Sequence, residues 1–93
     1  MNIHEFEIKP ELEKKLVKLF KKDKSTYEKI TKKIYEIINS RDIEHYKNLR
    51  YDMKDSKRVH IGHFVLVFSF DKSKNLVSFE DYDHHDIIYK PRK

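Results

Sequence analysis

The chain contains no cysteine, no tryptophan, one glycine and two prolines among its 93 residues. Without cysteine it can hold neither a disulfide nor a thiolate-bound metal, and small secreted domains usually need such cross-links. No apolar run reaches the length of a membrane span, and residues 1–8 lack the apolar segment of a signal peptide. We therefore expect a cytoplasmic protein without a membrane partner, and the length predicts a single domain over residues 1–93.

Charged residues, in contrast, make up 40% of the chain and leave a formal net charge of +5. A basic balance suits an anionic partner, nucleic acid first. Enrichment in lysine and glutamate is also the composition of heat-adapted proteins. The charge alone therefore favours a nucleic-acid partner only weakly.

The first half of the chain predicts a strand and two helices. Residues 2–8 predict the strand, and Pro10 suits the first turn of a helix because its missing N–H costs nothing there. Ser25 with Glu28 three residues later matches a capping box and predicts a second helix that ends near Asn39. Because few residues join the two helices, we expect them to form an antiparallel hairpin.

From about residue 58 the apolar period changes from that of a helix to that of strands, with a turn over residues 71–75. The residues assigned to the face covered by the helices are Val59, Ile61, Phe64, Leu66, Phe68 and Phe70. Alternation places on the opposite, open face Arg58, His60, Val65 and Val67. The predicted fold is α+β, with an N-terminal strand and an antiparallel two-helix hairpin packed on one face of a small antiparallel sheet. The two valines predict an apolar groove that a partner would cover.

Two segments carry most of the side chains capable of chemistry. The first, RVHIGHFVLVF, covers residues 58–68 and contains the only glycine, and the second, HHDIIY, covers residues 84–89. Their order and spacing resemble the RelE/ParE toxin superfamily of toxin–antitoxin systems, whose members read Arg-x-Arg-x-Gly-Asp-Tyr-Arg and close on a His-Arg…Tyr segment. Val65 departs from this pattern, since the family usually has arginine there.

The resemblance implies the RelE-like microbial RNase toxin fold. RelE-like members are endoribonucleases that cut mRNA, usually in the ribosomal A site, by attack of the 2′-OH and without a metal or other cofactor. A small acidic RelB-like antitoxin neutralises them in a hetero-oligomer such as a heterotetramer. ParE-like members share the fold and inhibit DNA gyrase. The expected partners are therefore an acidic antitoxin, mRNA and the ribosome.

Metal-free RNA cleavage needs a base, an acid and positive charge around the phosphate. The catalytic residues that the resemblance implies are Arg58, His60, His85 and Tyr89. The residues expected to bind RNA or phosphate are Lys54, Lys57 and His84. In these roles arginine would clamp the phosphate, histidine would exchange protons and tyrosine would stack a base.

Three alternatives remain open. Histidines 60, 63, 84 and 85 with Asp81 or Asp83 supply donors for zinc, although their spacing matches no zinc signature. A ParE-like inhibitor is favoured by Val65 and by an acidic cluster near the site, which consists of Glu80, Asp81, Asp83 and Asp86. A basic RNA-binding domain without catalysis would bind RNA in a salt-dependent way and release no products. Gly62 and His63 are interpreted as the hairpin turn.

Overall fold

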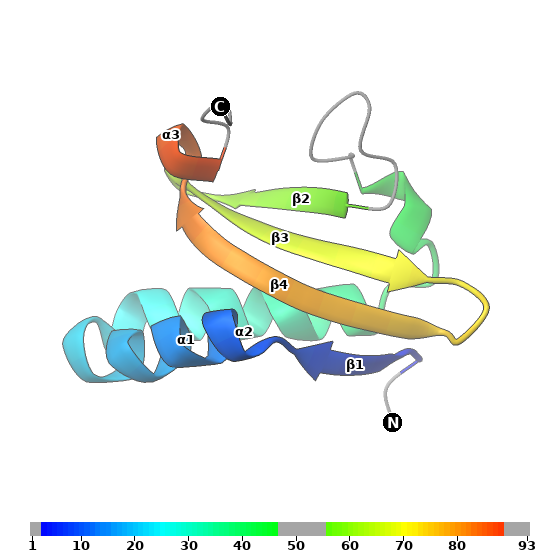
Figure 1. Cartoon of the computed structure of the whole chain (residues 1–93), viewed down its shortest axis with the longest axis horizontal. Coiled ribbons are helices and arrows are strands. Elements are labelled where there is room, and N and C mark those ends of the chain that lie inside the picture. Colours follow the sequence, from blue (N-terminus) through cyan, green and yellow to red (C-terminus); the bar gives the residue numbers. More distant parts are fainter. Residues whose placement is uncertain (1–2, 47–55, 89–93) are drawn as a thin grey trace.

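A computed structural model describes residues 3–46 and 56–88 of the chain (Figure 1). Its elements follow in the order β1 (Glu5–Ile8), α1 (Pro10–Lys22), α2 (Lys24–Ile38), a short 3-10 turn (Ile43–His45), β2 (Ser56–Ile61), β3 (Phe64–Asp71), β4 (Leu76–His84) and α3 (His85–Ile88). The two long helices lie side by side along one face of the sheet, and α3 sits at the end where β4 finishes. The predicted α+β arrangement is confirmed. No helix in the described ranges is long and apolar enough to cross a membrane.

The helix boundaries follow from local chemistry, with one correction. Pro10 opens α1 as predicted, and basic residues fill its last turn, where cations suit the helix dipole. The start of α2 is capped by Asp23, whose carboxylate accepts from the backbone N–H of Thr26 at 3.1 Å. The predicted capping box at Ser25 is therefore wrong, because the residue before the helix already supplies the acceptor. Asp23 alone separates the two helices.

The sheet has the strand order β1-β4-β3-β2, so β2 is an edge strand. Strands β2, β3 and β4 are antiparallel as predicted. The N-terminal strand β1 joins β4 in parallel, which makes the sheet mixed. The reason is topological, since the helical hairpin carries the chain across the sheet before β2 begins. A register shift between Val67 and Phe68 lets β4 accommodate Glu80 as an extra residue.

The core lies between the helical hairpin and one face of the sheet. Its buried members come from α1, α2, the 3-10 turn and the two central strands: Leu12, Leu16, Ile30, Ile34, Ile37, Ile38, Ile43, Leu66, Phe68, Val77, Phe79 and Tyr82. Val59, Ile61 and Phe70 pack against this cluster, as predicted from strand alternation. Phe64 is 37% exposed, because it begins β3 at the hairpin turn, and its ring stacks on Tyr82 at 5.0 Å.

The open face is not the apolar groove that the sequence predicts. Val65 is 0% exposed and Val67 6% exposed, although neither belongs to the main core cluster. Each valine has charged or titratable neighbours on β2 and on β4 in the sheet register. The valines therefore form a buried strip between two polar strands, and the prediction of an open apolar docking groove is wrong.

His4 holds the start of β1 in place. Its backbone N–H donates to the Ile38 carbonyl at 3.0 Å, and its ring nitrogens contact the Ser40 carbonyl at 2.6 Å and the side-chain oxygen of Asn75. The ring is buried and lies edge-on against Phe70. This histidine ties the N-terminal strand to the end of α2 and to the β3–β4 turn, which is a structural role.

Candidate active site on the open face of the sheet

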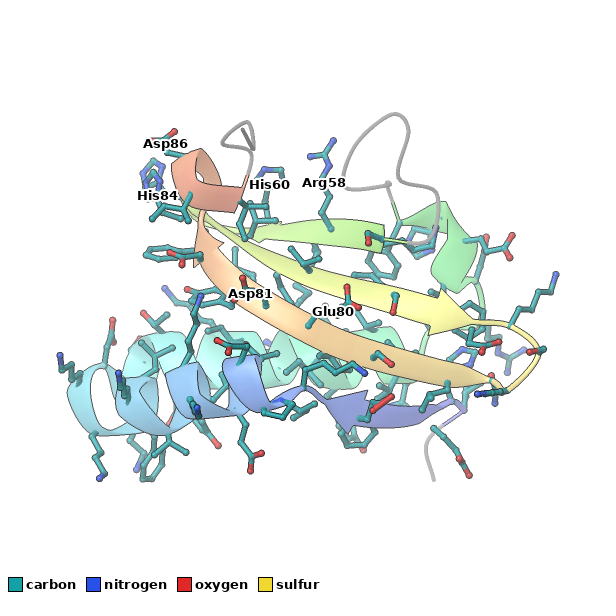
Figure 2. The ribbon with its side chains drawn as sticks, in the orientation of Figure 1. Arg58, His60, Glu80, Asp81, His84 and Asp86 are labelled. Carbon is teal, nitrogen blue, oxygen red and sulfur yellow. The ribbon has the colours of Figure 1, made fainter. Side chains whose placement is uncertain are left out.

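Arg58 and His60 lie on the edge strand β2 and point away from the helices (Figure 2). They are two residues apart, so strand alternation places both side chains on the same face, about 7 Å apart along the strand. His60 is exposed and Arg58 is partly exposed. The structure therefore brings together two of the four residues expected to be catalytic.

Two cross-strand rows define the chemistry of this face. Arg58 pairs with Val67, which pairs with Asp81. In the neighbouring row His60 pairs with Val65, which pairs with Asp83. Directly paired residues share a face, and adjacent strands lie about 4.8 Å apart. Each row thus runs from a basic or titratable group through a valine to a carboxylate about two strand spacings away.

Lys15 of α1 holds both carboxylates. Its ammonium group donates to the Asp81 carboxylate at 2.7 Å, to the Asp83 carboxylate at 2.9 Å and to the Tyr82 carbonyl at 3.1 Å. Burial lowers the pKa of Lys15, but the hydrogen bonds to the two aspartates outweigh it and leave the pKa raised. Burial raises the pKa of Asp83, but its carboxylate accepts hydrogen bonds from Lys15 and from the backbone N–H of His84. These bonds outweigh the burial and leave the pKa of Asp83 lowered. One lysine of α1 therefore offsets part of the negative charge on β4.

Lys57 lies on the face opposite to Arg58. It pairs with Phe68 on the covered side of the sheet, and the residue is 8% exposed. Its ammonium group donates to the Tyr46 carbonyl at 3.3 Å. The aliphatic stem covers apolar surface while the charge reaches a polar group, as is common for lysine. The structure thus separates Lys57 from the residues with which it was expected to bind RNA.

His84 is also set apart from Arg58 and His60. It ends β4 at the hairpin tip, where its ring stacks on His63 at 6.3 Å and lies edge-on to Phe64 at 5.6 Å. The backbone N–H of Asp86 donates to its Nδ1 at 3.2 Å, which requires that nitrogen to be unprotonated. The Asp86 carboxylate lies 3.5 Å from the same atom, a charged pair only if Nδ1 is protonated. Both contacts place the His84 ring beside the start of α3.

His85 is the first residue of α3, and α3 packs against the ends of β3 and β4. The His60 row is directly next to the last residue pair of β3 and β4, which is Phe64 with His84. The start of α3 and His60 therefore lie at the same end of the sheet. Lys54 and Tyr89 lie outside the described residues.

Within residues 3–46 and 56–88, no group of three or more His, Asp or Glu side chains is arranged to hold a metal ion. Three of the four histidines that could supply zinc donors do not lie together. His63 and His84 stack at the hairpin tip, whereas His60 projects from the edge strand. The arrangement that the structure offers is arginine with imidazole on one face, which suits phosphate binding and proton exchange.

Comparison with known proteins places the chain in a family. No model of a known protein family matches it. It is 50% identical over 92 residues to a protein of Methanocaldococcus jannaschii named "Putative toxin RelE4", an alignment that covers 98% of this chain and 96% of that protein. The chain belongs to the RelE toxin family. An uncharacterized protein of Methanosarcina mazei is 51% identical over 83 residues, which is 88% of this chain and 94% of that protein.

Solved structures show that the RelE-family fold is shared. A chain of the toxin–antitoxin complex RelBE2 from Mycobacterium tuberculosis superposes with a TM-score of 0.71 at 15% identity, over 90% of this chain and 93% of that chain. The isolated RelE toxin of E. coli superposes with a TM-score of 0.71 at 20% identity, over 87% of this chain and 83% of that chain. YafQ from E. coli superposes with a TM-score of 0.67 at 18% identity, over 92% of this chain and 98% of that chain. At these identities the likeness concerns the fold.

The sequence alone does not single out Lys15, because the lysines of the first helix together look like a solvated face. Lys15 differs from them in lying between Leu12 and Leu16, at the border of the apolar stripe. A lysine at the border of the apolar stripe can extend past the core to the end of a strand. This position on the helix is the signal that could have identified Lys15.

Proposed function

We propose that this protein is the toxin of a toxin–antitoxin system and acts as an endoribonuclease that cleaves mRNA in the ribosomal A site without a metal. The observation that carries the proposal is the pairing of Arg58 and His60 on the open face of the edge strand. Membership of the RelE family supports the toxin role. The position of His85 at the same end of the sheet supports a second imidazole for the reaction.

The proposed reaction is an in-line transfer. The 2′-oxygen of the ribose attacks the neighbouring phosphorus while the bond from phosphorus to the 5′-oxygen breaks, which leaves a 2′,3′-cyclic phosphate and a 5′-hydroxyl. One imidazole, His60 or His85, accepts the 2′-OH proton, and another group protonates the leaving 5′-oxygen. The Arg58 guanidinium binds the phosphate oxygens, where negative charge increases in the transition state. Tyr89 is proposed to stack a base.

The valine at position 65 fits this assignment. Its side chain is 0% exposed and lies between His60 and Asp83 in the register. An arginine at this position would lie beside Asp83, whereas Arg58 lies on β2, at the other edge of the described sheet from β1. Arg58 is therefore the group proposed to supply the charge that the family usually takes from position 65.

The acidic cluster is a weaker argument for a gyrase inhibitor than the sequence suggests. Asp81 and Asp83 are both bonded to Lys15, and Asp86 lies beside His84. Glu80 lies 3.5 Å from the Ser69 hydroxyl on the open face. With two of the four carboxylates paired to a cation, their repulsion of an RNA phosphate is reduced. The nuclease remains the preferred proposal.

An acidic antitoxin is the proposed protein partner. The net charge of +5 suits an acidic chain, and one of the related structures is itself a toxin–antitoxin complex. The helical hairpin also exposes large apolar side chains, with Val17 at 53%, Phe20 at 49% and Tyr35 at 63% exposure. Coexpression with the product of an adjacent acidic reading frame should give a stable complex without growth arrest, and failure to associate would contradict this part.

The function is tested by mapping cuts on mRNA in a translating extract by primer extension. The wild-type protein should produce codon-positioned breaks, and Arg58→Ala should reduce them by about 100-fold or more, the scale of lost transition-state charge stabilisation. A supercoiling assay with purified DNA gyrase runs in parallel. Intact mRNA together with inhibited gyrase would overturn the nuclease proposal in favour of the gyrase alternative.

A further inference from the structure

A pocket of about 250 Å³ lies where α2 passes the edge strand β2. Four residues of α2 and two of β2 line it: Lys29, Lys32, Lys33, Glu36, His60 and Ile61. The lining therefore carries three ammonium groups against one carboxylate. A volume of this size holds a phosphate group with part of its sugar, and the charge balance selects an anion over a cation.

The lysines converge on the pocket because of helical spacing. Lys29, Lys32, Lys33 and Glu36 stand at positions i, i+3, i+4 and i+7, which share one side of a helix. The buried stripe of the same helix, which includes Ile30, Ile34 and Ile37, faces the core. The side chain of Lys33 is held by the Glu36 carboxylate at 2.8 Å. Lys29 and Lys32 are exposed, so their ammonium groups can turn toward a bound anion.

The pocket joins the proposed active site through His60. This residue lines the pocket and shares the open face of β2 with Arg58. Because β2 is the edge of the sheet, no other strand among the described residues lies between its outer side and α2. An RNA strand bound at Arg58 can therefore pass over the edge at His60 and reach the α2 lysines without crossing the carboxylates of β4.

We propose that this pocket binds a phosphate of the RNA backbone next to the scissile one. The inference rests on the proposed function, since it assigns a subsite to the same substrate. Lysine ammonium groups suit this task, because they act as compact charges with rotatable donors and do not require one fixed phosphate orientation. The pocket recognises the backbone and so contributes affinity that does not depend on base sequence.

The test measures binding of a single-stranded RNA oligonucleotide with 2′-O-methyl groups, which cannot be cleaved, by fluorescence anisotropy at several salt concentrations. The variant is Lys29→Ala with Lys32→Ala. The matched control is Lys14→Ala with Lys18→Ala, which removes the same charge from exposed positions of α1. All proteins are compared by circular dichroism and thermal unfolding, and cleavage of unmodified mRNA is assayed with the same preparations.

The α2 variant should bind about tenfold more weakly, as expected for the loss of charge-assisted contacts to one phosphate. The slope of log K against log salt should fall by about 0.7 for that phosphate, while the control keeps the wild-type slope. Equal losses in variant and control, or no loss in either, would overturn the pocket and leave the nuclease intact if wild type still cuts mRNA. Pocket-dependent binding without any cleavage by wild type would support the pocket and overturn the nuclease.

Discussion

The two halves of the open face carry opposite charge and are built differently. On β2, Arg58 and His60 project from the edge of the sheet (Figure 2), whereas on β4 Asp81 and Asp83 are bonded to a lysine from helix α1. Buried valines of β3 separate the halves. The comparison teaches that the neighbouring helix decides how the carboxylates are held. Asp81 and Asp83 lie beyond the part of β4 that pairs with β1, where Lys15 of α1 can reach them, whereas β2 lies at the opposite edge of the sheet.

The largest effect is expected at the basic half. His60→Gln keeps a polar side chain of similar reach but cannot exchange a proton near neutral pH, so mRNA cleavage should fall by about 100-fold or more. Single-stranded RNA binding should change by less than about threefold, because glutamine keeps a hydrogen-bonding side chain of similar reach at this position. Single-turnover cleavage and anisotropy titration separate the two quantities. Unchanged cleavage would remove His60 from the reaction.

The second effect concerns the acidic half. Lys15→Met removes the partner of Asp81 and Asp83, so two carboxylates on the open face lose their compensating charge. We expect RNA binding to weaken several-fold and the free energy of unfolding to drop by about 1 kcal/mol, a value reduced for partial solvent exposure. Lys14→Met, an exposed neighbour on the same helix, is the control. If both variants behave alike, the pairing has no electrostatic role.

The third effect is the pH dependence of the same ion pairs. The lowered pKa of Asp83 means that its stabilising contribution is present above the unfolded value near 3.8 and is lost as pH falls through the folded value. The raised pKa of Lys15 means that its contribution is present below 10.5 and is lost as pH rises through the folded value. The stability difference between wild type and Lys15→Met should therefore be greatest between these limits and shrink beyond them. A difference independent of pH, measured by urea unfolding, would contradict the ion-pair explanation.

The smallest effect on stability is expected at Tyr82, which lies between Asp81 and Asp83 on β4. Within the described residues the Tyr82 hydroxyl is buried without a hydrogen-bond partner, and burial, with the charges of Asp23 and Asp83, raises the pKa of this tyrosine. Tyr82→Phe should therefore leave the free energy of unfolding unchanged or raise it by up to about 1 kcal/mol. Phe64 still has a ring on which to stack. A loss of stability in urea unfolding would mean that the hydroxyl has a partner.

Much of the fold could be predicted because local patterns agree with one another. The helical spacing of apolar residues and the period of two in the strands fixed which faces enter the core. The parallel pairing of β1 with β4 could not be read from the sequence, since it depends on contacts between the two ends of the chain. The cap at Asp23 was missed because Ser25 and Glu28 match a capping-box pattern that begins two residues later.

The candidate site was predicted less completely, and Lys57 and Arg58 show why. Neighbouring residues on a strand face opposite ways, so two adjacent cations have different environments. Lys57 was grouped with the RNA-binding residues by its charge, although the alternation applied to Arg58 already sends it to the covered face. Burial of Val65 and Val67 could not be foreseen, because strand alternation gives the face of a residue but not what covers that face.

That adjacent pair gives the most direct measurement of the central claim. Arg58→Met and Lys57→Met each remove one charge from β2, one on the open face and one on the covered face. At temperatures where both variants are folded by circular dichroism, cleavage of mRNA in a translating extract should fall by about 100-fold for Arg58→Met and stay within about threefold of wild type for Lys57→Met. Equal activity of the two variants would contradict an active site on the open face of the sheet.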